Sequence, residues 1–449
     1  MNAPCGTEAA TELGSSRHLW VDAALVDALS PELRFRLHAP RVDGPESTQP
    51  SGHYMTILKE AWGYRAYCRR HLDSRPDALK EMDGNAGEYT ACAESVDGLR
   101  WTEPDLDIVK FPKDPHIRNA VLYETGLSHN FCPFKDTRPD CPPEERYKAL
   151  GGLYDATDGL FALTSPDGLR WRRKPGPPIF PKPERFAFDS QNVALYDPRE
   201  GKYALYFRLW EAKNGEHVRS VARIRSSDFE RWSEMELIGP NLPGEHLYAV
   251  APTPYFRAPE YLFTLPTRFF PERGDSTDIL FMSSRAGQPF ERLFTEAIIR
   301  PGPRPEAWGN RANYMALGLF PAGNGQMRMY HSLNKMRYTW RVDGFTSLCA
   351  GASQGEFTTR PFKFTGNSLL LNAETSGAGI LLAELLRADG ASIPGFGMEE
   401  CRGFYGDRVD FAMEWNGGRD LGELAGRPVR LRVRLREADF YSFQFVTLE

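Results

Sequence analysis

Short runs in which apolar and polar residues alternate recur between residues 46 and 352. Examples are "EYTACAES", "LFALTS", "VARIRSS" and "ILFMSS", and alternation of period two is typical of a β-strand with one buried face. Each run leads into a turn that ends in an aromatic residue: Trp101, Trp171, Trp232 and, in a weaker form, Phe290. The first two turns contain Asp-Gly, a strong hairpin signal. Helical periodicity is nearly absent, so the pattern predicts an all-β protein.

The alternating runs belong to a degenerate repeat. Upstream of each lies another strand-like segment with one or two tyrosines, as in "GYRAYCR", "RYKALGG", "KYALYFR" and "EYLFTLPTR", and a fifth segment is "QMRMYHS". Each unit spans roughly 55 to 70 residues with about four strands, which matches the blade of a β-propeller better than a sandwich. We therefore predict a five-bladed β-propeller over residues 46–352, with Trp101, Trp171 and Trp232 in its core.

The pattern changes after residue 352. The runs "FTTRPFKF", "NSLLLNAET", "DRVDFAMEW" and "RPVRLRVRLREADFYSFQFV" alternate strictly and are separated by Gly, Asn and Asp turns, as in an antiparallel sandwich. We predict a jelly-roll-like β-sandwich over residues 353–449 that braces the propeller. Residues 1–45, which include the strand-like "LRFRLHAP", are expected to pack on the propeller or on the sandwich.

Composition narrows the possible partners. The formal net charge is -5, from 55 basic and 60 acidic residues spread along the chain, so no basic stripe for nucleic acid and no polybasic membrane segment is present. Seven scattered cysteines without a C-x-x-C pair indicate free thiols. The N-terminal sequence lacks a signal-peptide pattern, which predicts a cytoplasmic protein as written, or a periplasmic or secreted one if a signal was removed. The oligomeric state is left open.

Five segments begin with polar residues ahead of an apolar strand: "GHYMTIL", "SHNFCPF", "DSQNVAL", "EHLYAVA" and "GNRANYMAL". In a propeller the first strand of each blade lines the central channel, so we expect these five heads to meet in one polar funnel. The alternative for any single residue is that it caps a turn. The predicted substrate-binding residues are His53, Tyr54, His129, Asn130, Gln191, Asn192, His246, Arg268, Asn310 and Arg311.

Two acids stand at neighbouring heads, Asp189 and Glu245. Carboxylates about 5 Å apart suit a retaining glycosidase and carboxylates about 6.5 to 9.5 Å apart suit an inverting one, so the pair is predicted to be catalytic. Arg268 is expected to anchor an acidic substituent of the substrate.

Other chemistries find little support. The chain lacks G-x-S-x-G, H-E-x-x-H, a phosphate-binding G-x-x-x-x-G-K and a G-x-G-x-x-G that opens a helix. No cofactor and no metal ligand set is predicted. A cation held in the funnel by His53, His129 and His246 stays an open alternative.

The segments "SHNFCPFKDTRPDCPPEERYKALGG", "FDSQNVALYDPREGKYALYFR", "YFRAPEYLFTLPTRF" and "WGNRANY" resemble a group of little-characterised bacterial proteins. These are labelled glycosyl hydrolase family 32 N-terminal-like or sialidase-like. The resemblance covers nearly the whole chain and implies a five-bladed propeller, a C-terminal sandwich and catalytic acids in the funnel. The Asn-Asp-Pro-Asn, Arg-Asp-Pro and Glu-Cys motifs of invertase-like enzymes are absent in register, so no catalytic residue is carried over from them.

The sequence thus predicts a glycoside hydrolase that acts on an oligo- or polysaccharide. Two alternatives remain: a glycoside phosphorylase on the same fold, which needs a cationic phosphate pocket, and a non-catalytic glycan-binding propeller.

Overall fold

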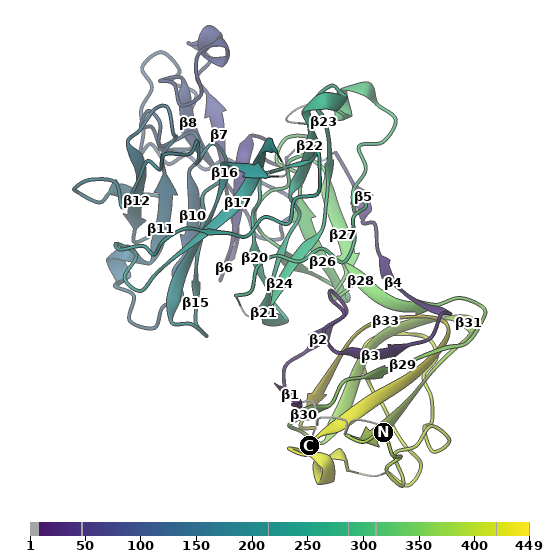
Figure 1. Cartoon of the computed structure of the whole chain (residues 1–449). Helices are drawn as coiled ribbons and strands as arrows, with labels where there is room; N and C mark the ends of the chain where they lie inside the picture. Colours follow the sequence, from purple (N-terminus) through teal and green to yellow (C-terminus); the bar gives the residue numbers. More distant parts are fainter. Residues whose placement is uncertain are drawn as a thin grey trace.

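The chain is described by a computed structural model that covers residues 9–45, 48–213, 215–285, 287–309, 312–418 and 420–448. These residues form an all-β protein, a five-bladed β-propeller followed by a jelly-roll-like β-sandwich (Figure 1). Within these ranges the only helices are short 3-10 turns: η1 (Pro76–Lys80), η2 (Pro143–Glu145), η3 (Pro271–Arg273), η4 (Pro305–Ala307) and η5 (Leu421–Leu424). None of the described helices has the length and apolar character needed to span a bilayer.

The first three blades are antiparallel sheets built from consecutive strands. Blade 1 contains β6 (His53–Glu60), β7 (Gly63–His71), β8 (Glu88–Ser95) and β9 (Ala120–Leu122). Blade 2 contains β10 (Cys132–Lys135), β11 (Tyr147–Gly151), β12 (Gly159–Ser165) and β13 (Arg172–Arg173), and β14 (Phe180–Pro181) also pairs with β12. Blade 3 contains β15 (Val193–Asp197), β16 (Lys202–Lys213), β17 (Glu216–Ser226) and β18 (Glu236–Leu237), and its β16–β17 hairpin is the longest of the propeller.

Blade 4 is divided into two three-stranded sheets. One contains β19 (His246–Tyr248), β22 (Thr267–Phe270) and β23 (Ser276–Ile279), and the other contains β20 (Thr253–Tyr255), β21 (Ala258–Thr264) and β24 (Met282–Arg285). Each of three extended segments of the chain supplies one strand to each sheet: β19 is followed by β20, β21 by β22, and β23 by β24. Pro252 and Pro266 stand at the breaks, where a residue without an N–H interrupts the ladder.

Blade 5 closes the ring with a strand from the N-terminal segment. Its sheet contains β25 (Phe320–Gly323), β26 (Gln326–Tyr330) and β27 (Arg337–Arg341), and the outer strand is β5 (Arg41–Asp43). A parallel bridge between Thr56 and Leu317 joins the inner strands of the first and last blades. The two ends of the propeller are therefore held together by backbone hydrogen bonds.

The hydrophobic core of the propeller lies between neighbouring blades. Each of five clusters combines residues of two adjacent blades, as where Tyr67 of blade 1 meets Ala149 of blade 2 and Tyr206 of blade 3 meets Leu262 of blade 4. The remaining three clusters join blades 2 and 3, 4 and 5, and 5 and 1. Five contiguous interfaces of this kind describe a closed ring of five blades.

The predicted turn motifs have an architectural role. The carboxylate of Asp97 accepts hydrogen bonds from the backbone N–H groups of Leu99 and Arg100 at 2.8 and 2.9 Å, and Asp167 and Asp228 bind their turns in the same way. The Tyr67 hydroxyl donates to the carbonyl of Gly168 in the next blade at 2.9 Å. Trp101 is buried, whereas Trp171 and Trp232 are half-buried and pack against the core clusters.

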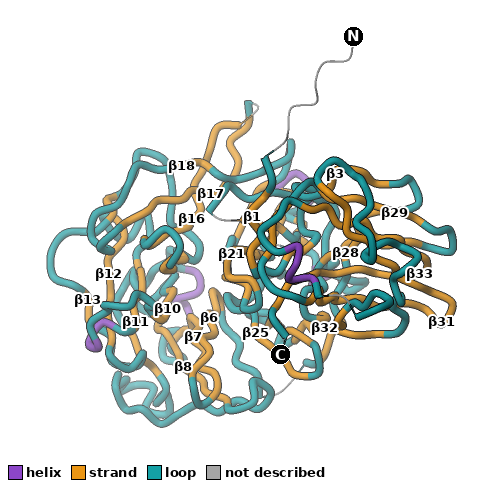
Figure 2. The backbone as a smooth tube through the Cα atoms, turned by 90° about the horizontal axis from the view of Figure 1, so that it is seen from below, coloured by secondary structure: helices purple, strands orange, loops and turns teal. Residues whose placement is uncertain are grey.

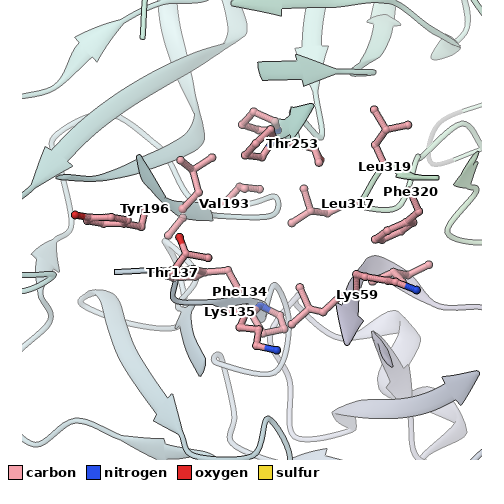
Figure 3. Close-up of a pocket in the computed structure, with 18 residues that line it drawn as sticks. Lys59, Phe134, Lys135, Thr137, Val193, Tyr196, Thr253, Leu317, Leu319 and Phe320 are labelled. Atoms are coloured by element: carbon pink, nitrogen blue, oxygen red, sulfur yellow. The ribbon is translucent and has the colours of Figure 1, made fainter. Parts of the chain in front are cut away.

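A cavity of about 240 Å³ lies where the inner strands end, and all five blades contribute to its wall (Figure 3). Its lining is largely apolar and includes Phe134, Val193, Thr253 and Leu317, together with the stems of Lys59 and Lys135. No carboxylate is among its lining residues. The polar heads of the inner strands lie at the other end of the channel, as the strand directions require.

The sandwich forms one ten-stranded sheet system beside the propeller (Figure 2). It contains β28 (Thr346–Ala350), β29 (Gly355–Thr359), β30 (Phe362–Phe364), β31 (Ser368–Arg387), β32 (Asp407–Ala412) and β33 (Val429–Val446). The N-terminal segment adds β1 (Thr11–Gly14), β2 (His18–Leu19), β3 (Val26–Leu29) and β4 (Leu33–Leu37).

Strand β28 changes the boundary that we placed at residue 352. It pairs with β33 and β4 in the sandwich sheet and has no partner in blade 5. Residues 9–45 also divide between the two modules, because β5 joins the propeller and β1 to β4 join the sandwich. The turn around Asp343, between β27 and β28, is therefore the point at which the chain leaves the propeller.

Candidate active site

Three tyrosines from three blades pack together at the polar end of the channel. Tyr248 and Tyr314 are stacked with ring centroids 5.4 Å apart and planes 9° apart, and Tyr54 lies 6.2 Å from Tyr314. They come from the heads of the inner strands of blades 1, 4 and 5, and all three are buried. Sequence analysis selected only Tyr54, although the quoted segments "EHLYAVA" and "GNRANYMAL" contain the other two.

Asp189 is the carboxylate next to these rings. Its Oδ2 lies 2.7 Å from Nη2 of Arg208, and its Oδ1 lies 3.8 Å from Nε2 of His129. Burial raises the pKa of Asp189, but the nearby His129 ring and the charge of Arg208 outweigh that effect and lower the pKa to about 2. With a side chain 21% exposed, Asp189 is an ionised group that a ligand can reach.

His129 connects Asp189 to a second carboxylate, that of Glu88. Nδ1 of His129 lies 2.9 Å from Oε2 of Glu88, and Arg69 contacts both side chains. Burial opposes ionisation of Glu88, yet the hydrogen bonds from His129 and His71 and the charge of Arg69 hold its pKa well below the usual range. Sequence analysis missed Glu88 because it is the first residue of an ordinary alternating run, "EYTACAES".

The backbone is strained at this end of the channel. Tyr54, Phe188 and Ala249 have φ angles of 52°, 70° and 51°, which place three non-glycine residues in the left-handed region. Such conformations cost about 1 to 3 kcal/mol each and persist where the surrounding structure enforces them, often at ligand sites. All three flank inner-strand heads, in blades 1, 3 and 4.

Glu245 has a different environment from Asp189. Its carboxylate forms an ion pair with Arg292 and accepts a hydrogen bond from the backbone N–H of Leu242 at 2.8 Å. Glu245 is 1% exposed. These contacts favour a role in holding the loop before β19, and the predicted catalytic pairing with Asp189 stays a prediction.

Several predicted substrate-binding residues hold the blades together. The Gln191 side chain donates to the backbone carbonyl of Tyr54 at 3.1 Å and to the Thr56 hydroxyl at 3.0 Å, joining blade 3 to blade 1. Asn130 donates to the carbonyls of Gly152 and Phe188, and the amide of Asn192 also donates to Phe188. These hydrogen bonds show a structural role, and the predicted substrate binding by these residues stays a prediction.

The remaining predicted residues lie in three kinds of setting. Nδ1 of His246 accepts hydrogen bonds from the backbone and side chain of Arg219, and Arg268 is paired with Asp278 at 2.6 Å and donates to the carbonyl of Thr295. His53 is the half-buried first residue of β6. Asn310 and Arg311 lie outside the described residues.

Two groups of side chains in the described residues could offer three ligand atoms to a metal ion. Asp83, Glu88 and His129 form one group, and Asp73, Asp114 and His116 form the other. In the first group Nη1 of Arg69 lies 2.7 Å from Nε2 of His129, and a guanidinium so close opposes a second cation. The three histidines of the predicted funnel cation site, His53, His129 and His246, do not form such a group in the described residues.

The comparisons with known proteins give weak likenesses. No protein-family model matches the chain, and no curated protein is similar in sequence. Among solved structures, a glycoside hydrolase family 43 arabinoxylan arabinofuranohydrolase from Bacillus subtilis has a TM-score of 0.41 and 11% identity, covering 89% of this chain and 96% of its own. A Bombyx mori GH32 β-fructofuranosidase has a TM-score of 0.41 and 9% identity, covering 94% and 96%. A β-1,2-mannobiose phosphorylase from Listeria innocua has a TM-score of 0.43 and 11% identity, covering 73% and 96%. Likenesses of this size assign no function to this chain.

Proposed function

We propose that the chain is a glycoside hydrolase whose substrate binds at the polar end of the propeller channel. The observation that supports this most directly is Asp189, an ionised and partly exposed carboxylate beside a cluster of buried tyrosines. Aromatic side chains with a few convergent polar groups are typical of a small-molecule site, and tyrosine offers both an apolar face and a hydroxyl.

Asp189 supplies the negative charge that glycosidic bond cleavage requires. The transition state has oxocarbenium-ion character, and a fixed carboxylate next to the anomeric carbon stabilises that positive charge. Arg208 keeps Asp189 ionised and restricts its orientation. The group therefore needs no reorganisation when the positive charge develops on the sugar.

His129 and Glu88 are proposed to position Asp189. The Glu88 carboxylate accepts from Nδ1 of His129, and Nε2 of His129 lies 3.8 Å from Oδ1 of Asp189 and 2.7 Å from Nη1 of Arg69. Because the Arg69 guanidinium opposes a second positive charge, His129 is not assigned as the proton donor to the leaving group. Replacing Glu88 by Gln should shift the pH profile of turnover, whereas a purely structural role would lower activity without moving the profile.

The test is the release of reducing sugar from a panel of oligosaccharides, with and without orthophosphate, by the wild type and by Asp189→Asn. We expect a fall in kcat of about 10²- to 10⁴-fold in the variant. The control is Asp140→Asn, because Asp140 is 82% exposed. Turnover that depends on orthophosphate would instead indicate a phosphorylase. Glycan binding without turnover in the wild type would reduce the protein to a binding propeller, and full activity of Asp189→Asn would remove the assignment.

A further inference from the structure

Three arginines lie at the polar end of the channel, and one of them has no acidic partner among the residues that the structure describes. Arg69 lies 3.6 Å from Glu88 and Arg208 lies 2.7 Å from Asp189. Arg219 forms no ion pair with a described carboxylate, and its Nη1 lies 3.1 Å from Nδ1 of His246. Burial and the charges of Arg219 and Arg208 lower the pKa of His246 to about 4, so this histidine is neutral at pH 7 and adds no charge.

The protein also leaves several guanidinium N–H groups without an acceptor. Nε and Nη1 of Arg208 and Nε of Arg219 are buried and have no hydrogen-bond partner in the described residues. Arg208 is 2% exposed, and a buried donor without an acceptor is costly. An arginine presents five donors in a planar fork, and here three donor atoms of the pair are buried without an acceptor in the described residues.

The two arginines are arranged side by side. Arg208 and Trp210 are two residues apart on β16 and therefore share one face, and Arg219 of β17 is paired with Trp210. The Arg208 and Arg219 side chains thus leave the same face of the hairpin. Both guanidiniums lie over the ring of Tyr248, with Cζ 4.8 Å and 5.4 Å from its centroid. Stacking uses the flat face of a guanidinium and leaves its N–H edge for hydrogen bonds. Burial and the charge of Arg208 lower the pKa of Arg219, as expected for two cations without enough negative charge between them.

A cavity of about 560 Å³ adjoins this pair. Its lining residues are Glu184, Arg185, Phe186, Trp210, Ala212 and His217, so the pair adjoins the cavity through aromatic neighbours and does not line it. The ring of Trp210 lies 4.4 Å from Cζ of Arg219, and the ring of Phe186 lies 5.9 Å from Cζ of Arg208. The volume lies within the range of small-ligand sites, about 300 to 1,000 Å³. Two aromatic walls suit a sugar ring better than a free inorganic ion, so an anion held here is expected to be part of a sugar.

We propose that Arg208 and Arg219 bind a carboxylate carried by the glycan, and that the substrate class is a uronic-acid-containing oligosaccharide. That the glycan is a substrate rests on the proposed function, whereas the binding of its carboxylate by the two arginines does not require turnover. Arg268, for which we expected this role, is paired with Asp278 as Arg208 is with Asp189, and its role stays a prediction.

The test is isothermal titration of the full chain with oligosaccharides containing glucuronate, galacturonate or mannuronate, each compared with its methyl ester. We expect at least one acid to bind about 10- to 100-fold more tightly than its ester, since hydrogen bonds to a charged group discriminate by that factor. Arg219→Gln should remove the preference, whereas Arg219→Lys should keep part of it. Arg100→Gln, which changes an 87% exposed arginine, is the control.

Three results would overturn the proposal: no acid form in the panel is preferred, the preference survives in Arg219→Gln, or inorganic phosphate binds in an Arg219-dependent manner while no uronate does. The two proposals fail separately. Uronate binding without turnover would refute the proposed hydrolase activity and support the arginine site. Turnover of neutral glycans only would support the hydrolase activity and refute the arginine site.

Discussion

Replacement of Asp343 by Asn should weaken the junction between propeller and sandwich. The Asp343 side chain is fully buried and accepts hydrogen bonds from five side chains, those of Arg17, Tyr255, Arg257, Asn372 and Ser442. Tyr255 and Arg257 belong to blade 4, Asn372 and Ser442 to the sandwich, and Arg17 to the N-terminal segment. One carboxylate therefore connects all three parts of the chain.

The size of the effect follows from these contacts. Asparagine keeps the shape of the side chain and tolerates the left-handed φ of 63° at this position, so the backbone is unaffected. It removes the charge and turns one acceptor into a donor that faces other donors. Breaking a buried ion pair on one side costs about 3 to 5 kcal/mol, and we expect the lower end because Asp410 also pairs with Arg17 and Arg257, at 2.7 and 2.6 Å.

The assay is scanning calorimetry, supported by urea unfolding. A loss of about 3 kcal/mol at roughly 2 °C per kcal/mol lowers Tm by about 6 °C. Asp410→Asn is the matched control, because Asp410 is 44% exposed and its removal should cost no more than about 1 kcal/mol. If Asp343→Asn were no less stable than Asp410→Asn, the assignment of Asp343 as the link between the modules would be refuted.

Further expectations concern the acids near the funnel. Glu245→Gln should lower thermal stability because Arg292 loses its buried partner. A fall in kcat per folded molecule of about 10²-fold or more would support the predicted Asp189–Glu245 pair, and a change within about twofold would remove Glu245 from it. The pKa of Asp189, lowered to about 2, makes a stabilising contribution that is present above the unfolded-state pKa near 4 and disappears as the pH falls through about 2. Urea midpoints of the wild type and Asp189→Asn should therefore converge between about pH 4 and pH 2, and a constant difference over that range would contradict this origin.

Strand patterns in the sequence predict only part of the candidate site. Asp189 could be selected from the sequence because it is a polar residue ahead of an apolar inner strand, and inner strands share one channel. Gln191 and Asn130 have the same pattern, yet their side chains hydrogen-bond to backbone carbonyls. Whether a polar head faces a ligand or a neighbouring blade depends on partners from other blades, which no local pattern contains.

By itself the sequence determined the all-β class, the five units and the sandwich, because period-two alternation and Asp-Gly turns are local properties of the chain. Only the tertiary structure decided that β5 completes blade 5, that Glu88 reaches His129, and that Arg219 forms no ion pair with a carboxylate of the described residues. The physical reason is that the state of a buried charge depends on which groups lie within a few ångströms of it. Here those groups come from different strands and often from different blades.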